Sequence, residues 1–121
     1  MLMVAFNFKS QFADDVESGR KRQTIRQKSR CRPGDALQLY TGMRTKNCRK
    51  LREAMCTEVV PIIIDRDAHG RLRVILDGWD LRGSRLDDLI KADGFARRMD
   101  MRDFFSEQYG LPFSGFLTRW D

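Results

Sequence analysis

An amine and a hydroxyl lie three residues apart in the most basic stretch of this chain. The stretch runs from Arg20 to Arg32 and holds seven Lys or Arg residues and no acid; the amine is that of Lys21 and the hydroxyl that of Thr24. A hydroxyl can attack a carbonyl carbon, or position a water that does so, when a neighbouring base takes the proton. Lys21 can be that base only if its pKa falls from about 10.4 toward neutrality. The spacing therefore permits amide hydrolysis, whereas a uniform run of positive charge would only attract anions.

The surroundings of Lys21 act on its pKa in opposite directions. Repulsion from the neighbouring arginines and partial burial both lower the pKa of the amine, and a nearby carboxylate raises it. In a regular strand, residues three apart point to opposite faces. We therefore expect Lys21 to belong to a turn after Gly19, because only then can its amine converge with the hydroxyl of Thr24.

The elements that must position these groups are short. Apolar spacing predicts helices over residues 11–18, 84–92 and 100–109, the last two capped by Ser84 and Asp100. Alternation and β-branched residues predict strands over residues 3–9, 21–27, 36–41, 57–65, 71–76 and 113–120. Pro61 implies an edge position or a bulge in its strand, and tight turns are predicted at 33–35 and 68–70. The fold class is α+β, a small, mostly antiparallel β-barrel with two or three short helices.

Composition limits the class of protein. At 121 residues, 41% hydrophobic and 33% charged, the chain is expected to form one soluble globular domain over residues 1–121. It has no apolar run near the ~20 residues of a membrane span, and its N-terminal residues lack the pattern of a secretory signal. We expect a cytoplasmic protein that does not bind a membrane.

Positive charge is concentrated in the first half of the chain. The net charge is +6; residues 1–60 hold 13 basic and 6 acidic side chains, and residues 61–121 hold 10 and 11. Such an asymmetry favours a surface that faces a polyanion, most often nucleic acid. By charge alone, a solvated basic face is an equal alternative.

The cysteines do not predict a metal site. Cys31, Cys48 and Cys56 could join His69 as four zinc ligands, but structural zinc sites usually take their ligands in close pairs, and no such pair is present. We expect reduced thiols, no metal and no cofactor.

Two patches of sequence resemble the ASCH domain family. The first is a short helix ending in Gly, a basic segment and a Pro-Gly-Asp turn that leads into a strand; its matching residues are Gly19, Lys21, Thr24, Arg26, Pro33, Gly34, Asp35 and Leu37. The second is Ala92-Asp93-Gly94-Phe95, followed by a helix carrying Phe104. The final strand also fits, so the resemblance covers roughly the whole chain.

The resemblance implies a PUA-like barrel, related to an RNA-binding fold, with a basic cleft. Some small bacterial members of the family are amidohydrolases that remove the acetyl group of N4-acetylcytidine with a Lys, a Thr and a Glu. Carried over, these catalytic roles fall on Lys21, Thr24 and Asp93, where Asp93 is one methylene shorter than the family's Glu. Other members are RNA-binding or ribonuclease-like.

We expect the remaining ligand contacts to come from the basic segments and one aromatic ring. The residues expected to contact phosphates or bases are Arg20, Arg22, Arg26, Tyr40, Arg44 and Lys46. The last two belong to an insertion over residues 41–52, and the loop around Asp93 would close the cleft. The expected partner is RNA or a nucleoside or nucleotide, with an acylated cytidine as substrate if the protein is an enzyme. The alternative is a non-catalytic protein- or RNA-interaction module that acts through its basic face. Trp79 and Trp120 are expected to pack in the core or at its rim.

Overall fold

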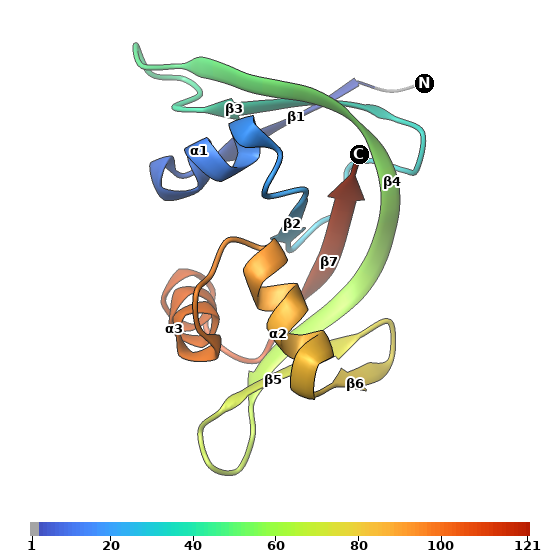
Figure 1. Ribbon diagram of the computed structural model, residues 1–121, viewed down its shortest axis with the longest axis vertical. Helices are drawn as coiled ribbons and strands as arrows, with labels where there is room; N and C mark the ends of the chain where they lie inside the picture. The colour runs from blue at the N-terminus through green and yellow to red at the C-terminus, as the bar shows by residue number, and fades with distance from the viewer. Residues whose placement is uncertain (1–2) are drawn as a thin grey trace.

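One long strand organises the sheet. The structure is a computed structural model that describes residues 3–121, and its strand β4 (Arg49–Arg66) has 18 residues. A straight strand of that length would span about 60 Å, although a compact chain of this size has a radius of gyration of only ~14 Å. β4 therefore has to bend, and Figure 1 shows it as an arch. A register shift between Cys56 and Glu58 lies within the bend.

The other six strands extend from β4. They are β1 (Met3–Phe8), β2 (Gln23–Arg26), β3 (Ala36–Thr41), β5 (Leu72–Leu76), β6 (Trp79–Leu81) and β7 (Phe113–Trp120). The first half of β4 pairs with β3, and β1 lies parallel to β3. The second half of β4 lies between β5 and β7, while β6 extends from β5 and β2 from β7. Every pairing except β1–β3 is antiparallel, which confirms an α+β fold with a mixed sheet.

The expected closed barrel is not confirmed, because the sheet is open. Within residues 3–121 no ladder joins β1 to β2. Two arginine side chains span this gap instead. Arg26 Nη2 donates to Asn7 O and Arg30 Nη2 donates to Ala5 O, both at 2.7 Å. These bonds satisfy carbonyls that a neighbouring strand would otherwise satisfy.

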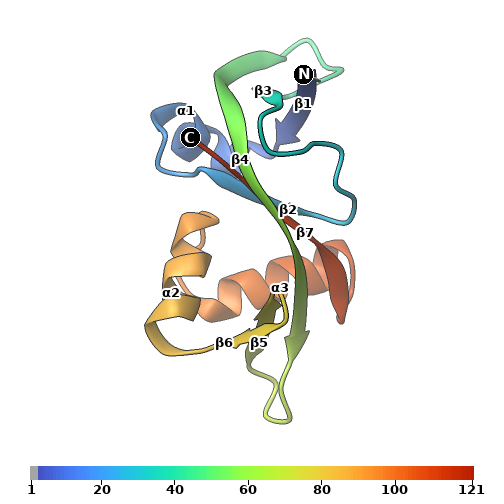
Figure 2. The same cartoon turned by 90° about the vertical axis from the view of Figure 1, so that its right-hand side faces the viewer.

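Three helices cover the concave side of the arch, as Figures 1 and 2 show. α1 (Ser10–Ser18) lies near β1 and β3, and α2 (Gly83–Ala92) and α3 (Arg98–Gln108) lie over the lower half of the sheet. The core between the helices and the sheet is apolar; its fully buried members include Phe6, Val16, Leu37, Leu39, Ile62, Ile64, Ile90, Met101, Phe105 and Leu117. This packing of apolar helix stripes holds α1 and α2 so that their ends face each other.

Several boundaries differ from the expectations. β4 begins at Arg49 rather than at residue 57, because the charged run before the apolar segment also pairs, with Leu51 buried beneath it. The expected insertion is therefore a loop over residues 42–48 only. The expected edge position of Pro61 is wrong, because β4 lies between β5 and β7 and Pro61 pairs with Phe116 of β7. Pro61 lies one residue before the β4–β5 ladder begins at Ile62, and its carbonyl accepts from the Asp77 N–H at 2.9 Å.

The helix starts and one tryptophan also need correction. α2 begins after Arg82 and α3 after Arg97, so neither Ser84 nor Asp100 is the N-cap. Asp100 sits in the first turn instead and accepts the Arg97 N–H at 3.1 Å. β6 was not expected. It carries Trp79, whose ring is 76% exposed rather than packed in the core, whereas Trp120 is buried as expected.

Candidate functional site

The turn that follows α1 positions Lys21 at the candidate site. The helix ends at Gly19, whose φ of 82° allows the left-handed cap, and the Gly19 N–H donates to Val16 O at 3.2 Å. Lys21 N–H then donates to Asp15 O at 2.8 Å, before β2 begins at Gln23. Lys21 therefore belongs to the turn, as expected. The alternation of a strand does not apply across positions 21 and 24, so both side chains can face one cavity.

The C-terminal end of α2 positions Asp93 beside Lys21. Asp93 is the C-cap of the helix, and Gly94 follows with a φ of 97°. A Cβ at position 94 would lie 3.0 Å from the ring of Phe12 on α1 and 3.6 Å from Lys21 Cδ. The glycine thus lets the two helix ends approach closely enough for Asp93 and Lys21 to meet.

Lys21 and Asp93 form a buried pair. Lys21 Nζ donates to the backbone oxygen of Asp93 at 2.6 Å and lies 3.3 Å from Asp93 Oδ1. Both side chains are almost without solvent contact, at 3% and 5% exposure. The carbonyl at a helix C-terminus carries partial negative charge, which also favours a cation there. The amine faces the Phe12 ring, with its nitrogen 4.9 Å from the ring centroid.

Burial acts on both members of this pair. It lowers the pKa of the Lys21 amine, and the charge and hydrogen bond of Asp93 oppose that effect. Burial also raises the pKa of the Asp93 carboxyl, against the charge of Lys21 and the hydrogen bond from Gln23. Burial thus favours the uncharged form of each group, whereas their mutual attraction and the Gln23 hydrogen bond favour the charged forms.

Thr24 joins the pair at one cavity of about 220 Å³ that all three side chains line. Its hydroxyl oxygen accepts a hydrogen bond from Arg26 Nε at 3.2 Å. The walls are aromatic rings from β1, α1 and α3, namely Phe8, Phe12, Phe104, Phe105 and Tyr109. A small cavity with flat apolar walls and a few polar groups suits a planar ring better than an extended chain.

The arginine of β2 is held rigidly at the cavity. Arg26 bonds Thr24 Oγ1 and Asn7 O, and its guanidinium carbon lies 4.8 Å from the Phe6 ring centroid and 5.2 Å from that of Phe8. Two of its five N–H groups are used in these hydrogen bonds. Arg26 therefore presents a fixed positive charge to anything bound beside Thr24.

Gln23 is a site residue that the sequence did not indicate. Its side chain is 2% exposed, and Nε2 donates to Asp93 Oδ1 at 3.1 Å and to Leu89 O at 3.4 Å. This donor favours the charged carboxylate and fixes its orientation. In the sequence, the only indication of this role is an amide side chain in a short strand. The role becomes evident only when the end of α2, which carries Asp93, is placed beside it.

The other expected contact residues do not line this cavity. Arg20 pairs with Asp15 at 2.9 Å, and Arg22 Nε donates to Gly19 O at 2.8 Å. Tyr40 donates to Gln38 Oε1 at 3.3 Å on β3. Arg44 and Lys46 are exposed in the 42–48 loop. Of the six residues expected to contact phosphates or bases, Arg26 alone reaches the Lys21 cavity.

The cysteines and the one histidine lie apart from the cavity. Cys31 and Cys56 are buried with their sulfurs 4.0 Å apart, Cys48 is exposed, and His69 lies in an exposed turn. Burial and the neighbouring Cys31 raise the pKa of the Cys56 thiol to about 11. Over residues 3–121, no three His, Cys, Asp or Glu side chains cluster in a way that could hold a metal ion. In the same range, no helix has the length and apolar character needed to cross a membrane.

Comparisons with known proteins give no match for this chain, whether with family models, curated proteins or solved structures. The ASCH resemblance therefore stays a prediction.

Proposed function

We propose that this protein is a small-molecule amidohydrolase, with the cavity of Lys21, Thr24 and Asp93 as its active site and an acylated cytidine or a related nucleoside amide as its substrate. The observation that carries the proposal is the buried Lys21–Asp93 pair, which shares a cavity with a hydroxyl. A buried ion pair is often less stabilising than apolar residues of the same volume, and ionisable groups with perturbed pKa values that line a cavity are candidates for a functional site. The resemblance to the ASCH family and its PUA-like fold adds the substrate class.

The size of the cavity favours a nucleoside over a strand of RNA. Drug-sized ligands occupy cavities of about 300–1,000 Å³, whereas this one has about 220 Å³. A single base fits such a volume, stacked against the aromatic walls. A polynucleotide would have to bind elsewhere on the surface.

The chemistry follows from the positions of the three side chains. The neutral amine of Lys21 takes a proton as the oxygen of Thr24, or of a water that Thr24 holds, attacks the amide carbon. Arg26, already bonded to Thr24 Oγ1, stabilises the negative charge that develops. The Lys21 ammonium returns the proton to the exocyclic nitrogen as the C–N bond breaks. Where Thr24 itself attacks, the acyl group is then an ester on Thr24 Oγ1; a water that gives its proton to the neutral Lys21 amine attacks this ester, and the Thr24 oxygen takes the proton back as the acid leaves. One water is consumed, and the products are the free amine and a carboxylic acid.

Asp93 has two roles in this scheme. It positions the Lys21 amine through its backbone and side-chain oxygens, and it stabilises the ammonium formed in the transition state. Its shorter side chain, compared with the Glu of the family, is compensated by its place at the helix end, where the backbone oxygen also reaches Lys21.

The proposal is tested by incubating the protein with N4-acetylcytidine and measuring cytidine by chromatography. Lys21→Met and Thr24→Val preserve shape and should each lower kcat/KM at least ~100-fold, the lower end of what a general base contributes. Lys28→Met and Thr57→Val, at exposed positions, serve as controls and should retain activity. Thermal denaturation of each variant separates lost chemistry from lost folding. If the parent protein released no more cytidine than Lys21→Met does, the proposal would be overturned.

A further inference from the structure

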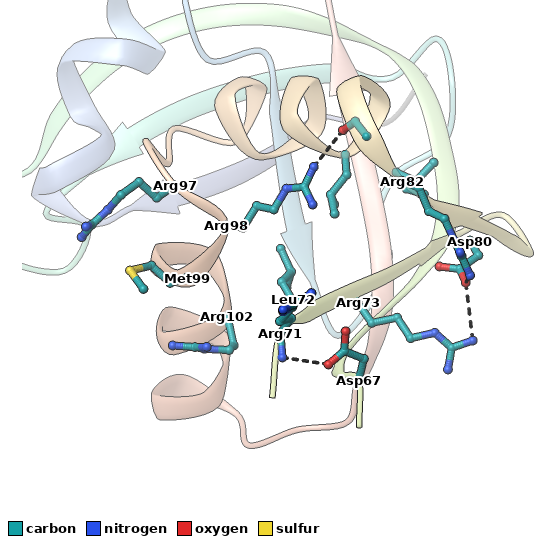
Figure 3. Close-up of a pocket in the computed structure, with 13 residues that line it drawn as sticks. Asp67, Arg71, Leu72, Arg73, Asp80, Arg82, Arg97, Arg98, Met99 and Arg102 are labelled. Atoms are coloured by element: carbon teal, nitrogen blue, oxygen red, sulfur yellow. Dashed lines mark hydrogen bonds and ion pairs between the residues drawn. The ribbon is translucent and has the colours of Figure 1, made fainter. Parts of the chain in front are cut away.

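A second cavity lies on the other side of α3, away from Lys21. It has a volume of about 670 Å³, about three times that of the Lys21 cavity. The β5–β6 hairpin, the start of α2 and the first half of α3 form its walls (Figure 3). The Lys21 cavity, in contrast, contacts α3 at Phe104, Phe105 and Tyr109. One helix therefore separates two different binding surfaces.

Arginines dominate the second cavity, which we call the arginine groove. Its basic lining residues are Arg71, Arg73, Arg82, Arg97, Arg98 and Arg102, and its acidic ones are Asp67 and Asp80. These arginines belong to segments of the chain that are up to 31 residues apart, yet they line one cavity. In Figure 3, Arg73 and Arg82 lie on the hairpin side, and Arg97 and Arg102 lie on the side of α3. The second half of the chain has no excess of positive charge, so the fold alone creates this concentration.

Two of the arginines are fixed across the groove. Arg102 Nη1 donates to Gly70 O in the β4–β5 turn at 2.9 Å, and Arg98 Nη2 donates to Gly83 O at the start of α2 at 3.1 Å. These bonds tie α3 to both other walls and leave further N–H groups of each guanidinium free to bind an anion. A preorganised guanidinium loses less freedom when it binds an oxyanion.

Several of the arginines already have aspartate partners. Arg97, Arg98 and Arg102 pair with Asp100, Asp87 and Asp103, and Asp80 pairs with Arg73 and Arg82. These pairs lie at the surface, where an ion pair contributes about 0–1 kcal/mol. A phosphate oxygen can therefore replace a carboxylate at little cost. The aspartates limit how strongly a single phosphate binds, so affinity must come from several contacts.

An exposed aromatic residue lies on a strand that borders the groove. β6 contributes Asp80 and Leu81 to the groove lining, and Trp79 is the residue before them on the same strand. Trp79 and Leu81 share a face of β6, since they pair with Leu76 and Val74, and Trp79 is 76% exposed. An exposed aromatic side chain on a strand that borders a cationic groove can stack on an unpaired base.

We propose that the arginine groove binds single-stranded nucleic acid, with successive phosphates on its arginines and a base stacked on Trp79. Six cations distributed over the groove suit a chain of phosphates rather than one. Stacking on Trp79 requires a base that is not already stacked in a duplex. The proposal does not depend on the reaction at Lys21.

Tryptophan fluorescence provides the test, because Trp79 is exposed and Trp120 is 3% exposed. A titration with a single-stranded oligonucleotide such as a 12-mer of uridine should quench Trp79. Affinity should fall steeply with salt, since binding releases counterions with a slope of about 0.7 per phosphate contact on single strands. The variant Arg71→Ala/Arg73→Ala/Arg82→Ala should lower affinity at least tenfold and reduce the salt slope by about 2. Trp79→Ala, followed by anisotropy of a labelled oligonucleotide, should lower affinity at least ~5-fold and leave the salt slope unchanged.

A control of equal charge makes the result decisive. Lys28→Ala/Arg32→Ala/Lys91→Ala removes three exposed cations outside the groove and should bind nearly as the parent does. Equal losses in the two triple variants would mean that net charge alone attracts the strand, and would overturn the proposal. So would displacement of the oligonucleotide by polyglutamate at the same charge concentration, which would indicate an acidic protein as partner.

The same variants distinguish this proposal from the proposed enzyme activity. The groove variants should hydrolyse N4-acetylcytidine like the parent, and Lys21→Met should bind the oligonucleotide like the parent. Loss of strand binding in Lys21→Met with retention in the groove variants would place the strand at the Lys21 cavity, which overturns the inference drawn here.

Discussion

Lys21 and Asp93 combine the features of a structural ion pair with those of a reactive one. Their mutual attraction is strong because little water surrounds them, but the same lack of water penalises each charge. Lys21 has additional partners in the Asp93 backbone oxygen and the Phe12 ring, and Asp93 has Gln23. The pair is therefore held in place by contacts that survive when a proton moves between its members.

Stability measurements on single and double variants of Lys21 and Asp93 test how strongly the two buried groups depend on each other. Lys21→Met leaves the Asp93 carboxyl unpaired and should lower the free energy of unfolding by about 3–5 kcal/mol, the cost of breaking a buried pair. Asp93→Asn should cost less, because the backbone oxygen of residue 93 still accepts from Lys21. The double variant should be more stable than Lys21→Met alone. Urea unfolding measures all three, and additive losses would contradict a coupled pair.

The pH dependence of stability follows from the directions of the two shifts. Asp93 has a raised pKa in the folded state, so stability falls as pH rises from 3.8 through the folded pKa. Lys21 has a lowered pKa, so stability rises again as pH rises from its folded pKa to 10.5. The parent should thus show a shallow minimum between these windows. Urea unfolding at a series of pH values should show a shallower minimum for the variant Lys21→Met/Asp93→Asn.

The sequence identified the three side chains that line this cavity better than the residues that support them. Lys21 and Thr24 could be identified by type and spacing, and the glycine before them explained how a turn brings them together. The acid at position 93 came from the resemblance alone. Gln23 could not be predicted, because its role depends on a helix end 70 residues away. The hydrogen bonds of Arg26 to Thr24 and to Asn7 of β1 were not predicted, and its expected contact with a phosphate stays a prediction.

At the scale of elements, the position of β2 depends on a close approach to β7. Gly115 pairs with Ile62, and a Cβ at position 115 would lie 2.3 Å from Arg26 O and 2.7 Å from the Phe113 ring. β2 carries both Thr24 and Arg26. The absence of a side chain at one position of β7 therefore allows β2 to lie where the cavity needs it.

Replacement of that glycine tests the link between packing and chemistry. Gly115→Ala should push β2 away from β7 and lower stability by about 1–3 kcal/mol, the usual cost of overpacking. Hydrolysis of N4-acetylcytidine should fall more than stability alone explains, because Thr24 and Arg26 move. Ser114→Ala, at the exposed neighbouring position, is the control. Full activity in folded Gly115→Ala would contradict this role of β2.

Helices and strands were predicted correctly where the local sequence pattern determines the secondary structure. They were missed where a strand forms only because a neighbouring strand pairs with it. The ranges of β3 and β7 were predicted in full; alternation is clean in β3, and β7 is rich in apolar and aromatic residues. The first half of β4 is charged and was missed; its strand conformation comes from β3 beside it. β6 has only three residues and no pattern of its own. The open sheet depends on arginine side chains between β1 and β2, which no propensity describes.

At the scale of the whole molecule, positive charge is distributed by the fold rather than by position in the sequence. Counting charges along the chain pointed to residues 1–60, but six arginines of the second half gather in the arginine groove. Cations of both halves pair with acids or backbone oxygens, so pairing does not distinguish the two halves. The polyanionic partner expected from net charge stays a prediction, and net charge alone does not say on which face of the molecule the cations gather.

β4 should make the molecule unfold as one unit. Its first half supports β3 and β1, and its second half supports β5, β6 and β7. Neither half of the sheet can lose its order without freeing part of the same strand. We expect one cooperative transition, with coincident loss of Trp120 fluorescence and circular dichroism. Hydrogen exchange should be slowest at the amides of residues 62–64, where β4 has partners on both sides; two separate transitions would contradict cooperative unfolding.

The three thiols differ in exposure, so a dye can be attached selectively to one of them. Cys56 is a thiol at neutral pH and lies buried against Cys31. Alkylating reagents should therefore react slowly with both side chains. Cys48 is exposed in the loop between β3 and β4. A maleimide dye would therefore label one site without mutagenesis, opposite in the fold to the hairpin that carries Trp79. Energy transfer from that tryptophan to the dye would then follow the shape of the arch directly in solution.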